Sequence, residues 1–485
     1  MRALTVRAVL FKGIGDLIPL YALYAVLFAD HGLSTGQISS LLAMWSATAF
    51  LLEVPSGAWA DTVSRRGLLV TSGVLLTAGF TCWTVLPTYL GFAAGFVLWG
   101  TSGALVSGTF EALLYDELVA RNEQRAYPRI IGYARAASEA AIVIAILAAT
   151  PLYIWGGYPL LGWCSVAFAA VHTLLGLSLP SAPKAVSAAA VEDLDDSAGS
   201  PEIVVAPTRE VAVKESSASR VVAAAGQCDR DSAQGPAQSG SVAADGTLRR
   251  RPAPAADSGS SSVHIAASIS TESRPFATYL NMLRTGVGEA IRVRAVRNGV
   301  ALGALLFGVT AFDEYFALLA QEVGVETAVV PMLVGITVVG SLVGSVMAGR
   351  TEGMSARAMA IAVALGGVLF VGGAVIAGLA VRWPGAVYVL AGVGFTAIGV
   401  SYGIVYNASV VAGARLQDAI EGPARATVTS VSGLVSEVVA LAVFGFAAVA
   451  TLWLSMSTTV ALLGASMLAI ALLIPSSLPR RKSDS

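Results

Sequence analysis

The stretch Gly57-Ala-Trp-Ala-Asp61-Thr-Val-Ser-Arg65-Arg66 joins two long apolar runs of the chain. Gly57 would let a neighbouring helix approach closely, and Asp61 at a helix end can pair with a basic group or a helix N-terminus. The two arginines would hold the turn at the membrane surface, where basic residues of inner loops gather. The stretch therefore predicts a tight turn between two membrane-spanning helices.

The chain on either side has the matching composition. Of its 485 residues, 55% are hydrophobic and 13% are charged, whereas a soluble domain carries about a quarter charged residues. Twelve apolar runs are long enough to cross a bilayer as helices. They cover residues 8–29, 38–60, 68–86, 89–113, 131–152, 158–179, 297–319, 328–349, 358–380, 386–409, 427–449 and 453–474.

These runs fall into two sets of six, separated by a long polar interval. We therefore expect an all-α membrane protein with twelve transmembrane helices in two six-helix bundles. The N-terminal bundle is predicted over residues 1–180 and the C-terminal bundle over residues 297–476. The first run is too long for the apolar part of a cleavable signal peptide, so it is interpreted as a span.

The lysines and arginines give an independent test of this topology. If the N-terminus is cytoplasmic, 29 of the 30 basic residues fall in inner connections and only Arg382 falls outside. Without the thirteen in the long central interval the ratio is still 16 to 1, as expected from the enrichment of basic residues in inner loops. Both termini and the central interval are therefore expected in the cytoplasm.

The central interval differs in composition from both halves. Residues 181–274 are rich in Ala, Ser, Asp, Gly and Pro, and such a segment buries too little apolar area to offset its ordering entropy. We expect a disordered cytoplasmic linker, which is either a plain connection or a regulatory or partner-binding segment. Residues 275–296 regain helical periodicity and are predicted to form an amphipathic cytoplasmic helix. A cytoplasmic tail is expected over residues 477–485.

The stretch that begins at Gly57 resembles the signature of the major facilitator superfamily: a glycine, an acid four residues later, then a basic pair after a short turn. Thr62 stands where the family usually has a basic residue, and Ser64 where it usually has glycine. Together with the six-plus-six topology, the resemblance implies the major facilitator fold with a long cytoplasmic central loop. It also implies a conformational role for four residues: Gly57, Asp61, Arg65 and Arg66.

A weaker copy of the signature lies in the second half, as expected of a transporter built from repeats. The loop from Gly344 to Arg350 keeps the glycine and lacks the acid. Residues 108–118 resemble a pattern of bacterial members without a defined substrate. The 26 arginines against 4 lysines also suggest a GC-rich bacterial genome. We therefore expect a multi-pass protein of the bacterial plasma membrane.

Ionisable side chains inside membrane spans are costly and mark candidate functional sites. In the first half, Asp16 follows Lys12 and Glu139 follows Arg135 by four residues, a spacing that allows a salt bridge on one helical face. Each acid is therefore either a coupling residue or part of a structural network, which Glu111 could join. The candidates for proton coupling in the whole chain are Asp16, Glu53, Glu139, Asp313 and Glu437.

The other candidates have different surroundings. Pro55 should kink the helix beside Glu53. Asp313 and Glu314 are adjacent and cannot share one helical face, so at most one should reach a central cavity. Glu437 lies in the eleventh span, which has no basic residue. An unpaired carboxylate at that depth should be protonated much of the time, as a proton-coupled carrier or a binder of organic cations requires.

Aromatic and amide side chains occur on the helices expected to line the cavity. A mostly apolar cavity with few polar groups suits lipophilic or cationic cargo, because aromatic rings attract cations. Ordinary packing is the alternative for each ring. The candidates are Tyr21, Tyr24, Trp45, Trp99, Phe307, Tyr315, Tyr402, Tyr406 and Asn407.

We therefore expect a secondary active transporter that moves a small molecule by alternating access, through proton-coupled efflux of lipophilic or cationic compounds. The alternatives are a metabolite uptake symporter and, from another class, a membrane receptor or scaffold that uses the central loop. The expected partners are a small-molecule substrate, protons and the lipid bilayer, with a monomeric protein and no nucleic acid. The chain has no Walker loop, no His-Glu-x-x-His motif and no clustered cysteines, so no enzyme, metal site or cofactor is expected.

Overall fold

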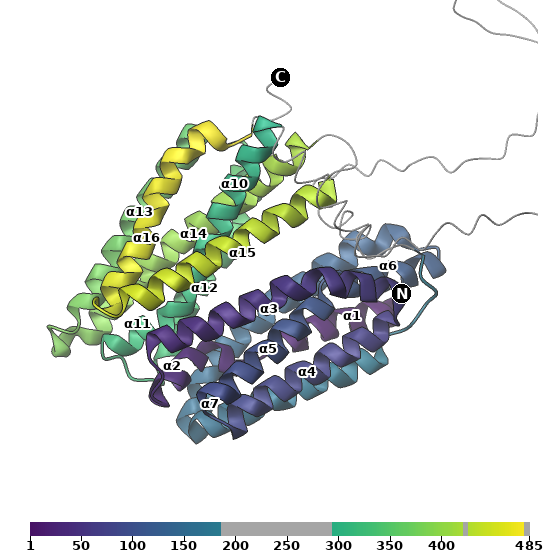
Figure 1. Ribbon diagram of the computed structural model, residues 1–485, viewed down its shortest axis with the longest axis horizontal. Helices are drawn as coiled ribbons and strands as arrows, with labels where there is room; N and C mark the ends of the chain where they lie inside the picture. Colours follow the sequence, from purple (N-terminus) through teal and green to yellow (C-terminus); the bar gives the residue numbers. More distant parts are fainter. Residues whose placement is uncertain (186–292, 421–424, 480–485) are drawn as a thin grey trace, which may run out of the picture. The chain divides into compact units, whose positions relative to one another are not determined.

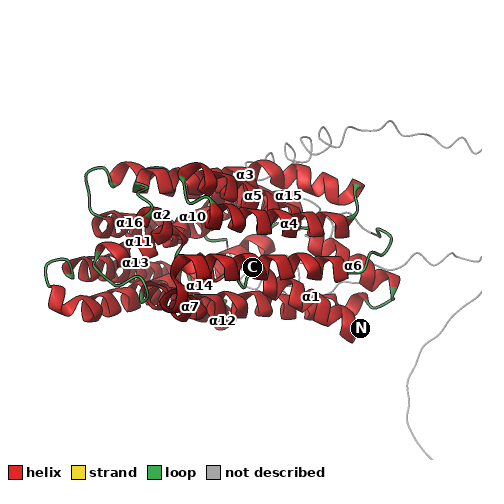
Figure 2. Cartoon of the chain, turned by 90° about the horizontal axis from the view of Figure 1, so that it is seen from below, coloured by secondary structure: helices red, strands yellow, loops and turns green. Residues whose placement is uncertain are grey.

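The computed structural model describes residues 1–185, 293–420 and 425–479, and within these ranges the regular elements are helices (Figures 1 and 2). Three predictions fall wholly or largely outside the described residues: the linker beyond residue 185, the amphipathic helix up to residue 292, and the tail beyond residue 479. The first half contains α1 (Arg2–Gly15), η1 (Pro19–Ala22), α2 (Tyr24–Asp30), α3 (Thr35–Thr62), α4 (Arg65–Val85), α5 (Tyr89–Val106), α6 (Thr109–Ala120), η2 (Gln124–Ala126) and α7 (Tyr127–Ser178), where η marks a 3₁₀ helix.

The second half has a similar sequence of elements. It contains α10 (Arg294–Gly308), η3 (Val309–Tyr315), α11 (Phe316–Glu322), α12 (Val330–Thr351), α13 (Ala356–Leu379), η4 (Pro384–Ala386), α14 (Val387–Ala419), α15 (Arg425–Ala450) and α16 (Met456–Ser477).

Helix α7 holds two spans. Its 52 residues would reach about 78 Å if straight, more than twice the thickness of the hydrocarbon core. Gly156 and Gly157 leave the helical region, and Gly157 has a φ of 59°, which glycine adopts without strain. Ser138 before this break contacts Asp16, the C-cap of α1, and His172 after the break contacts Phe11 of α1, so the chain reverses at the two glycines.

The number of spans follows from this reversal. Ten helical stretches in the described residues are long and apolar enough to cross a membrane, and the bent helix α3 makes eleven. The second arm of α7 supplies the twelfth crossing. The predicted architecture of twelve transmembrane helices is therefore confirmed.

Three spans are broken and one is bent. The first span is divided into α1, η1 and α2, the fourth into α5 and α6, and the seventh into α10, η3 and α11. Helix α3 bends by 45° between Glu53 and Pro55, as the proline predicts. Irregular backbone at membrane depth is tolerated where it is buried in protein or lines a cavity, so these breaks direct attention to the centre of the molecule.

Glycines set the closest helix contact of the second half. A Cβ at Gly340 of α12 would lie 2.0 Å from the carbonyl oxygen of Gly399 in α14, and a Cβ at Gly344 would lie 2.0 Å from that of Gly403. Small residues allow such backbone contact in membranes, where packing rather than the hydrophobic effect drives association. The backbones of α12 and α14 therefore touch along a glycine seam, defined by these four residues.

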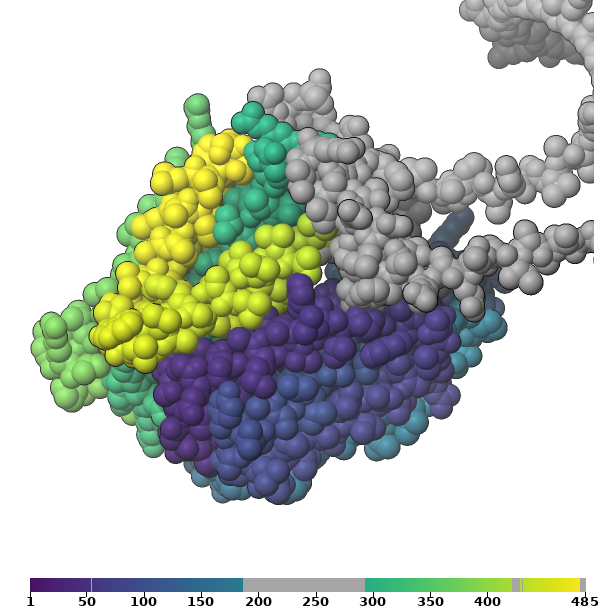
Figure 3. Space-filling view, in the orientation of Figure 1, coloured from purple at the N-terminus to yellow at the C-terminus, as the bar shows by residue number. Residues whose placement is uncertain are grey.

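The two halves pack through α3 against α15, α7 against α12, and α2 against α11. In the space-filling view, the surface of α15 lies directly against that of α3 (Figure 3). At one end of this interface Asp30 accepts hydrogen bonds from Tyr158 Oη and Gln321 Nε2, each at 2.6 Å. Side chains of α2, the second arm of α7 and α11 are thereby joined at one carboxylate.

Candidate functional site

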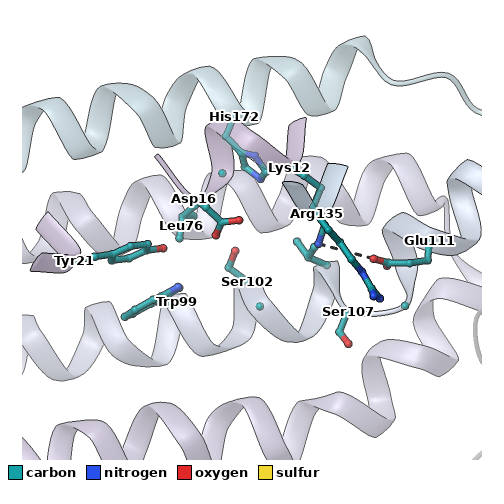
Figure 4. Close-up of a pocket in the computed structure, with 14 residues that line it drawn as sticks. Lys12, Asp16, Tyr21, Leu76, Trp99, Ser102, Ser107, Glu111, Arg135 and His172 are labelled. Carbon is teal, nitrogen blue, oxygen red and sulfur yellow. Dashed lines mark ion pairs between the residues drawn. The ribbon is translucent and has the colours of Figure 1, made fainter. Parts of the chain in front are cut away.

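A cavity of about 420 Å³ lies within the first half, between α1, α4, α5, α6 and α7 (Figure 4). The break between α5 and α6 opens onto it, since Ser107 and Gly108 both line it. We call it the first-half cavity. Its other polar or aromatic lining residues are Lys12, Asp16, Tyr21, Trp99, Ser102, Glu111, Arg135 and His172.

Aromatic rings close one end of the first-half cavity. Tyr21, which the 3₁₀ turn of η1 carries inward, stacks on Trp99 with ring centroids 5.0 Å apart. Trp45 of α3 lies 5.1 Å from the same indole. Three of the rings selected from the sequence are thus brought together. Tyr24, the remaining aromatic candidate of the first half, is 6% exposed and packs in the core against Phe28, so its ring does not line the cavity.

The charged residues of this cavity pair differently from the sequence expectation. Lys12 lies nearest to Glu111, with Nζ 3.8 Å from Oε1, instead of forming a salt bridge with Asp16. Asp16 accepts a hydrogen bond from Ser138. Glu111 reaches Lys12 from the first turn of α6, which begins after the break at Gly108.

Two neighbours of this cavity have further roles. Sequence reasoning assigned nothing to His172, whose Nδ1 is 2.9 Å from the carbonyl oxygen of Phe11. This bond makes Nδ1 the donor and leaves Nε2 as an acceptor. Glu139 does not line the cavity.

A second cavity, of about 160 Å³, lies between the two halves. Trp45 and Ser46 of α3 form one side, and residues of α10, η3 and α15 form the other; we call it the interface cavity. Its lining contains three carboxylates and no basic side chain. The acidic and aromatic lining residues are Trp45, Phe307, Asp313, Glu314, Glu437 and Phe444.

Glu437 links the two halves at this cavity. Ser46 Oγ donates a hydrogen bond to its carboxylate. The expectation that Glu437 is unpaired is therefore corrected, because a hydroxyl of the opposite half reaches it. Its partner is neutral, so its charge remains uncompensated by any lysine or arginine among the residues that line the cavity.

The adjacent acids of the seventh span both reach the interface cavity, in contrast to the expectation that at most one would do so. The cavity follows the chain from Phe307 to Glu314 around the end of α10 and η3, so neighbouring residues line different parts of it. Tyr402 donates a hydrogen bond to Asp313. The carboxylate of Glu314 makes no hydrogen bond or ion pair with the residues that the structure describes.

The other candidates from the sequence lie outside both cavities. Tyr315 is fully buried and hydrogen bonds to Ser39, and the ring of Tyr406 packs 4.9 Å from that of Tyr402. Asn407 donates to the carbonyl oxygen of Gly344 at 2.9 Å, within an apolar groove of α12, α13 and α14. Their assignment to a substrate cavity stays a prediction.

Two of the signature residues, Arg65 and Asp61, form a charge cluster with Asp116, in which Arg65 is buried and Asp61 is 39% exposed. Arg65, 4% exposed, contacts Asp116 of α6 at 2.6 Å and Asp61 at 3.2 Å. Asp116 also accepts a hydrogen bond from the backbone of Ala185 at 2.8 Å. No atom of the described residues lies within 4 Å of a Cβ built at Gly57. Close helix contact therefore does not explain this glycine in the present conformation.

The second half has a counterpart of opposite polarity. Arg415, near the end of α14, donates to the carbonyl oxygens of Glu352, at 2.9 Å, and Met354 in the loop between α12 and α13. In the first half, the acid Asp116 lies on the fourth span and the base Arg65 follows the second span. In the second half, the base Arg415 lies on the tenth span, and the loop after the eighth span supplies backbone carbonyl groups instead of an acid. Only the internal repeat could have directed attention to Arg415 from the sequence.

Twelve apolar helices, with broken spans around internal cavities, define an integral membrane transporter. The family model of the Major Facilitator Superfamily matches residues 8–436, and the chain belongs to that superfamily. It is a secondary transporter of a small molecule rather than an enzyme.

Solved structures share this fold at low sequence identity. A mutant of the nucleoside transporter NupG superposes with a TM-score of 0.64 at 9% identity, over 98% of this chain and 99% of that chain. A second structure of NupG gives 0.60 at 9% identity, over 99% of this chain and 98% of that chain. No curated protein matches this chain in sequence.

Proposed function

We propose that this transporter exports lipophilic organic cations in exchange for protons. The observation that carries the proposal is the interface cavity, where three carboxylates and three aromatic rings meet without a basic side chain. Carboxylates and aromatic faces both attract organic cations. The cavity lies between the two halves, which is where a carrier that alternates between two openings must hold its substrate.

The exchange of a cationic substrate for protons follows from the uncompensated charge of Glu437. Enclosing a carboxylate without a countercharge carries a desolvation penalty, so an empty and ionised cavity resists closure. Either a proton or a cationic substrate removes this cost by neutralising Glu437, and each displaces the other. With the termini and the central segment in the cytoplasm of a plasma-membrane protein, the inward proton gradient then drives export by a monomer.

Transport by purified protein in liposomes tests the proposal. Vesicles with an acidic interior should accumulate ethidium, tetraphenylphosphonium or rhodamine 6G as protons leave. Glu437→Gln should lower this accumulation about tenfold or more, because the loss of a charged contact is worth at least 1.4 kcal/mol. Glu326→Gln, an exposed glutamate between α11 and α12, is the matched control and should transport normally. The proposal is wrong if wild type accumulates none of the three dyes, or if Glu437→Gln matches the control.

A second candidate is proton-coupled uptake of a neutral, polar aromatic metabolite. It is favoured by the first-half cavity, whose paired charges sum to zero beside the stacked rings of Tyr21 and Trp99. Solved structures of a nucleoside transporter also share the fold. Labelled uridine and adenosine in the same vesicles distinguish the two candidates. Entry with protons and no accumulation of dye would favour uptake.

A further inference from the structure

The two cavities differ in the charges that they present. The first-half cavity has two bases, Lys12 and Arg135, together with two acids, Asp16 and Glu111, whereas no basic residue lines the interface cavity. The cavities are neighbours, because Trp99 lines one, Trp45 lines the other, and their ring centroids are 5.1 Å apart. A molecule that reaches both cavities by displacing these rings would meet only acidic charged groups at one end and, at the other, the two bases beside Glu111.

Lys12 is held in the first-half cavity without a hydrogen bond to any described residue, although its ammonium lies 5.2 Å from the centroid of the Phe110 ring. The carboxylate oxygen nearest to this ammonium, on Glu111, lies 3.8 Å away. That distance is beyond hydrogen-bond range. The other oxygen of Glu111 is buried and also has no hydrogen-bond partner within the described ranges. The donors of Lys12 are therefore available to an acceptor that enters the cavity.

The broken fourth span adds positive potential at the same place. Helix α6 begins at Thr109 without a side-chain cap, and the preceding residues Ser107 and Gly108 line the cavity. The first N–H groups of a helix are unsatisfied and favour an anion. Figure 4 shows the side chain of Arg135 extending toward Ser107.

Asp16 belongs to the other end of this cavity. It precedes Tyr21 and lies one helical turn from Lys12, about 6 Å along α1. Ser138 already donates to it. Figure 4 accordingly places Asp16 toward Tyr21, and Lys12 and Arg135 toward Glu111. The basic end is thus separated from the acid nearest to it in sequence.

We infer that the substrate is amphoteric. Its cationic group binds the acids of the interface cavity, its aromatic or aliphatic body lies along Trp45 and Trp99, and its anionic group binds Lys12 and Arg135. The inference rests on the proposed export of organic cations and narrows their class. Each half of the transporter would then bind one charged group of the same molecule.

Matched pairs of synthetic ligands test this inference. The probes are 4-(aminomethyl)phenyl derivatives of acetic, butanoic and hexanoic acid, each compared with its methyl ester, which keeps the ammonium and removes the negative charge. Affinities are measured by calorimetry on purified full-length protein in detergent. At one or more of the three lengths, the acid should bind about tenfold more tightly than its ester, as expected for charge-assisted hydrogen bonds.

Variants separate the two ends of the ligand. Lys12→Gln should reduce the acid-to-ester ratio to about twofold or less without changing the affinity of the ester, while Lys12→Arg should keep the ratio. Glu437→Gln should weaken acid and ester equally. If Lys12→Gln does not fold, as judged by thermal unfolding without ligand, Arg135→Gln serves for the same measurement.

The possible outcomes test this inference separately from the proposed export of organic cations, on which it rests. If acids and esters bind equally at all three lengths, or if the ratio survives Lys12→Gln, the substrate is not amphoteric, although export of cations still holds. If no probe binds, or Glu437→Gln alters neither affinity, the cation proposal fails and the inference fails with it.

Discussion

Ser39 of α3 and Tyr315 of η3 share a hydrogen bond of 2.7 Å although they lie 276 residues apart in the sequence. Both side chains are buried, and Tyr315 has no exposed area. The bond joins the two halves of the transporter beside the interface cavity. It must break when the halves separate at this end, so it favours the conformation described here.

The phenol of Tyr315 should therefore control the opening of this end. Tyr315→Phe keeps the ring and removes the bond, which costs about 1–2 kcal/mol when a buried partner is left unsatisfied. A cysteine at Ala43, one turn along α3, should then react about five to thirty times faster with an impermeant maleimide, in a background without native cysteines.

The matched control for this variant is Tyr89→Phe. Tyr89 makes a similar bond of 3.0 Å to Ser40, but within the first half alone. Its loss should leave the labelling rate at Ala43 unchanged. Equal rates for the two variants would show that Tyr315 has no special part in holding the halves together.

The pair Arg65–Asp116 should be essential for stability. Asp116→Ala leaves the guanidinium of Arg65 at 4% exposure with the 39% exposed Asp61 as its remaining carboxylate, so a loss of about 3 kcal/mol, the low end for a broken buried pair, is expected. Thermal unfolding of the purified variant measures this loss. Arg66→Gln, at the next position, should change stability by about 0.5 kcal/mol or less. A loss as small for Asp116→Ala would mean that the pair contributes little.

The glycine seam should not accept a methyl group. Gly340→Ala places a Cβ 2.0 Å from the oxygen of Gly399, so α12 and α14 must move apart, and a loss of about 1–3 kcal/mol is expected from overpacking. Gly349→Ala, with open space around its Cβ, should be neutral or stabilising by up to about 1 kcal/mol from helix propensity. Unfolding in graded detergent mixtures compares the two, and a neutral Gly340→Ala would contradict the close contact.

Removal of the central segment separates a carrier from a scaffold. Replacing residues 187–270 by a Gly-Ser linker of equal length keeps Ala185, whose backbone contacts Asp116. Because the described cavities are lined by residues outside this segment, accumulation of dye in liposomes should persist at about the wild-type rate, as for an exchange of flexible linkers. Loss of transport with intact folding would favour a role of the segment in the activity itself.

Hydrophobic patterning predicted the spans because each helix must present about 20 apolar residues to lipid. Even the bend at Pro55 was foreseen, since proline removes a backbone donor. The breaks in the first and seventh spans were not foreseen. Pro19 begins η1 in the first span, but its effect there was not predicted from the sequence; the seventh span has no proline, so tertiary contacts select its 3₁₀ geometry. The double turn at Gly156 and Gly157 was visible only as the gap between two apolar runs.

The candidate site was foreseen in its residue types more than in its pairings. Depth in a span singled out Asp16 and Glu437, but their partners Ser138 and Ser46 come from other helices. Spacing along one helix favoured a bond between Lys12 and Asp16, whereas Glu111 approaches from a broken span. Partners across helices depend on packing, which a single sequence does not specify.

The direct backbone contact of α12 with α14 also restricts how the second half can move. Because a Cβ at Gly340 or Gly344 would meet the partner backbone at 2.0 Å, no side chains lie there that could change rotamer as the helices slide. We expect the two helices to travel as one rigid body throughout the transport cycle. Bending within the second half is then expected in α10, η3 and α11, the interrupted span that carries Asp313 and Glu314.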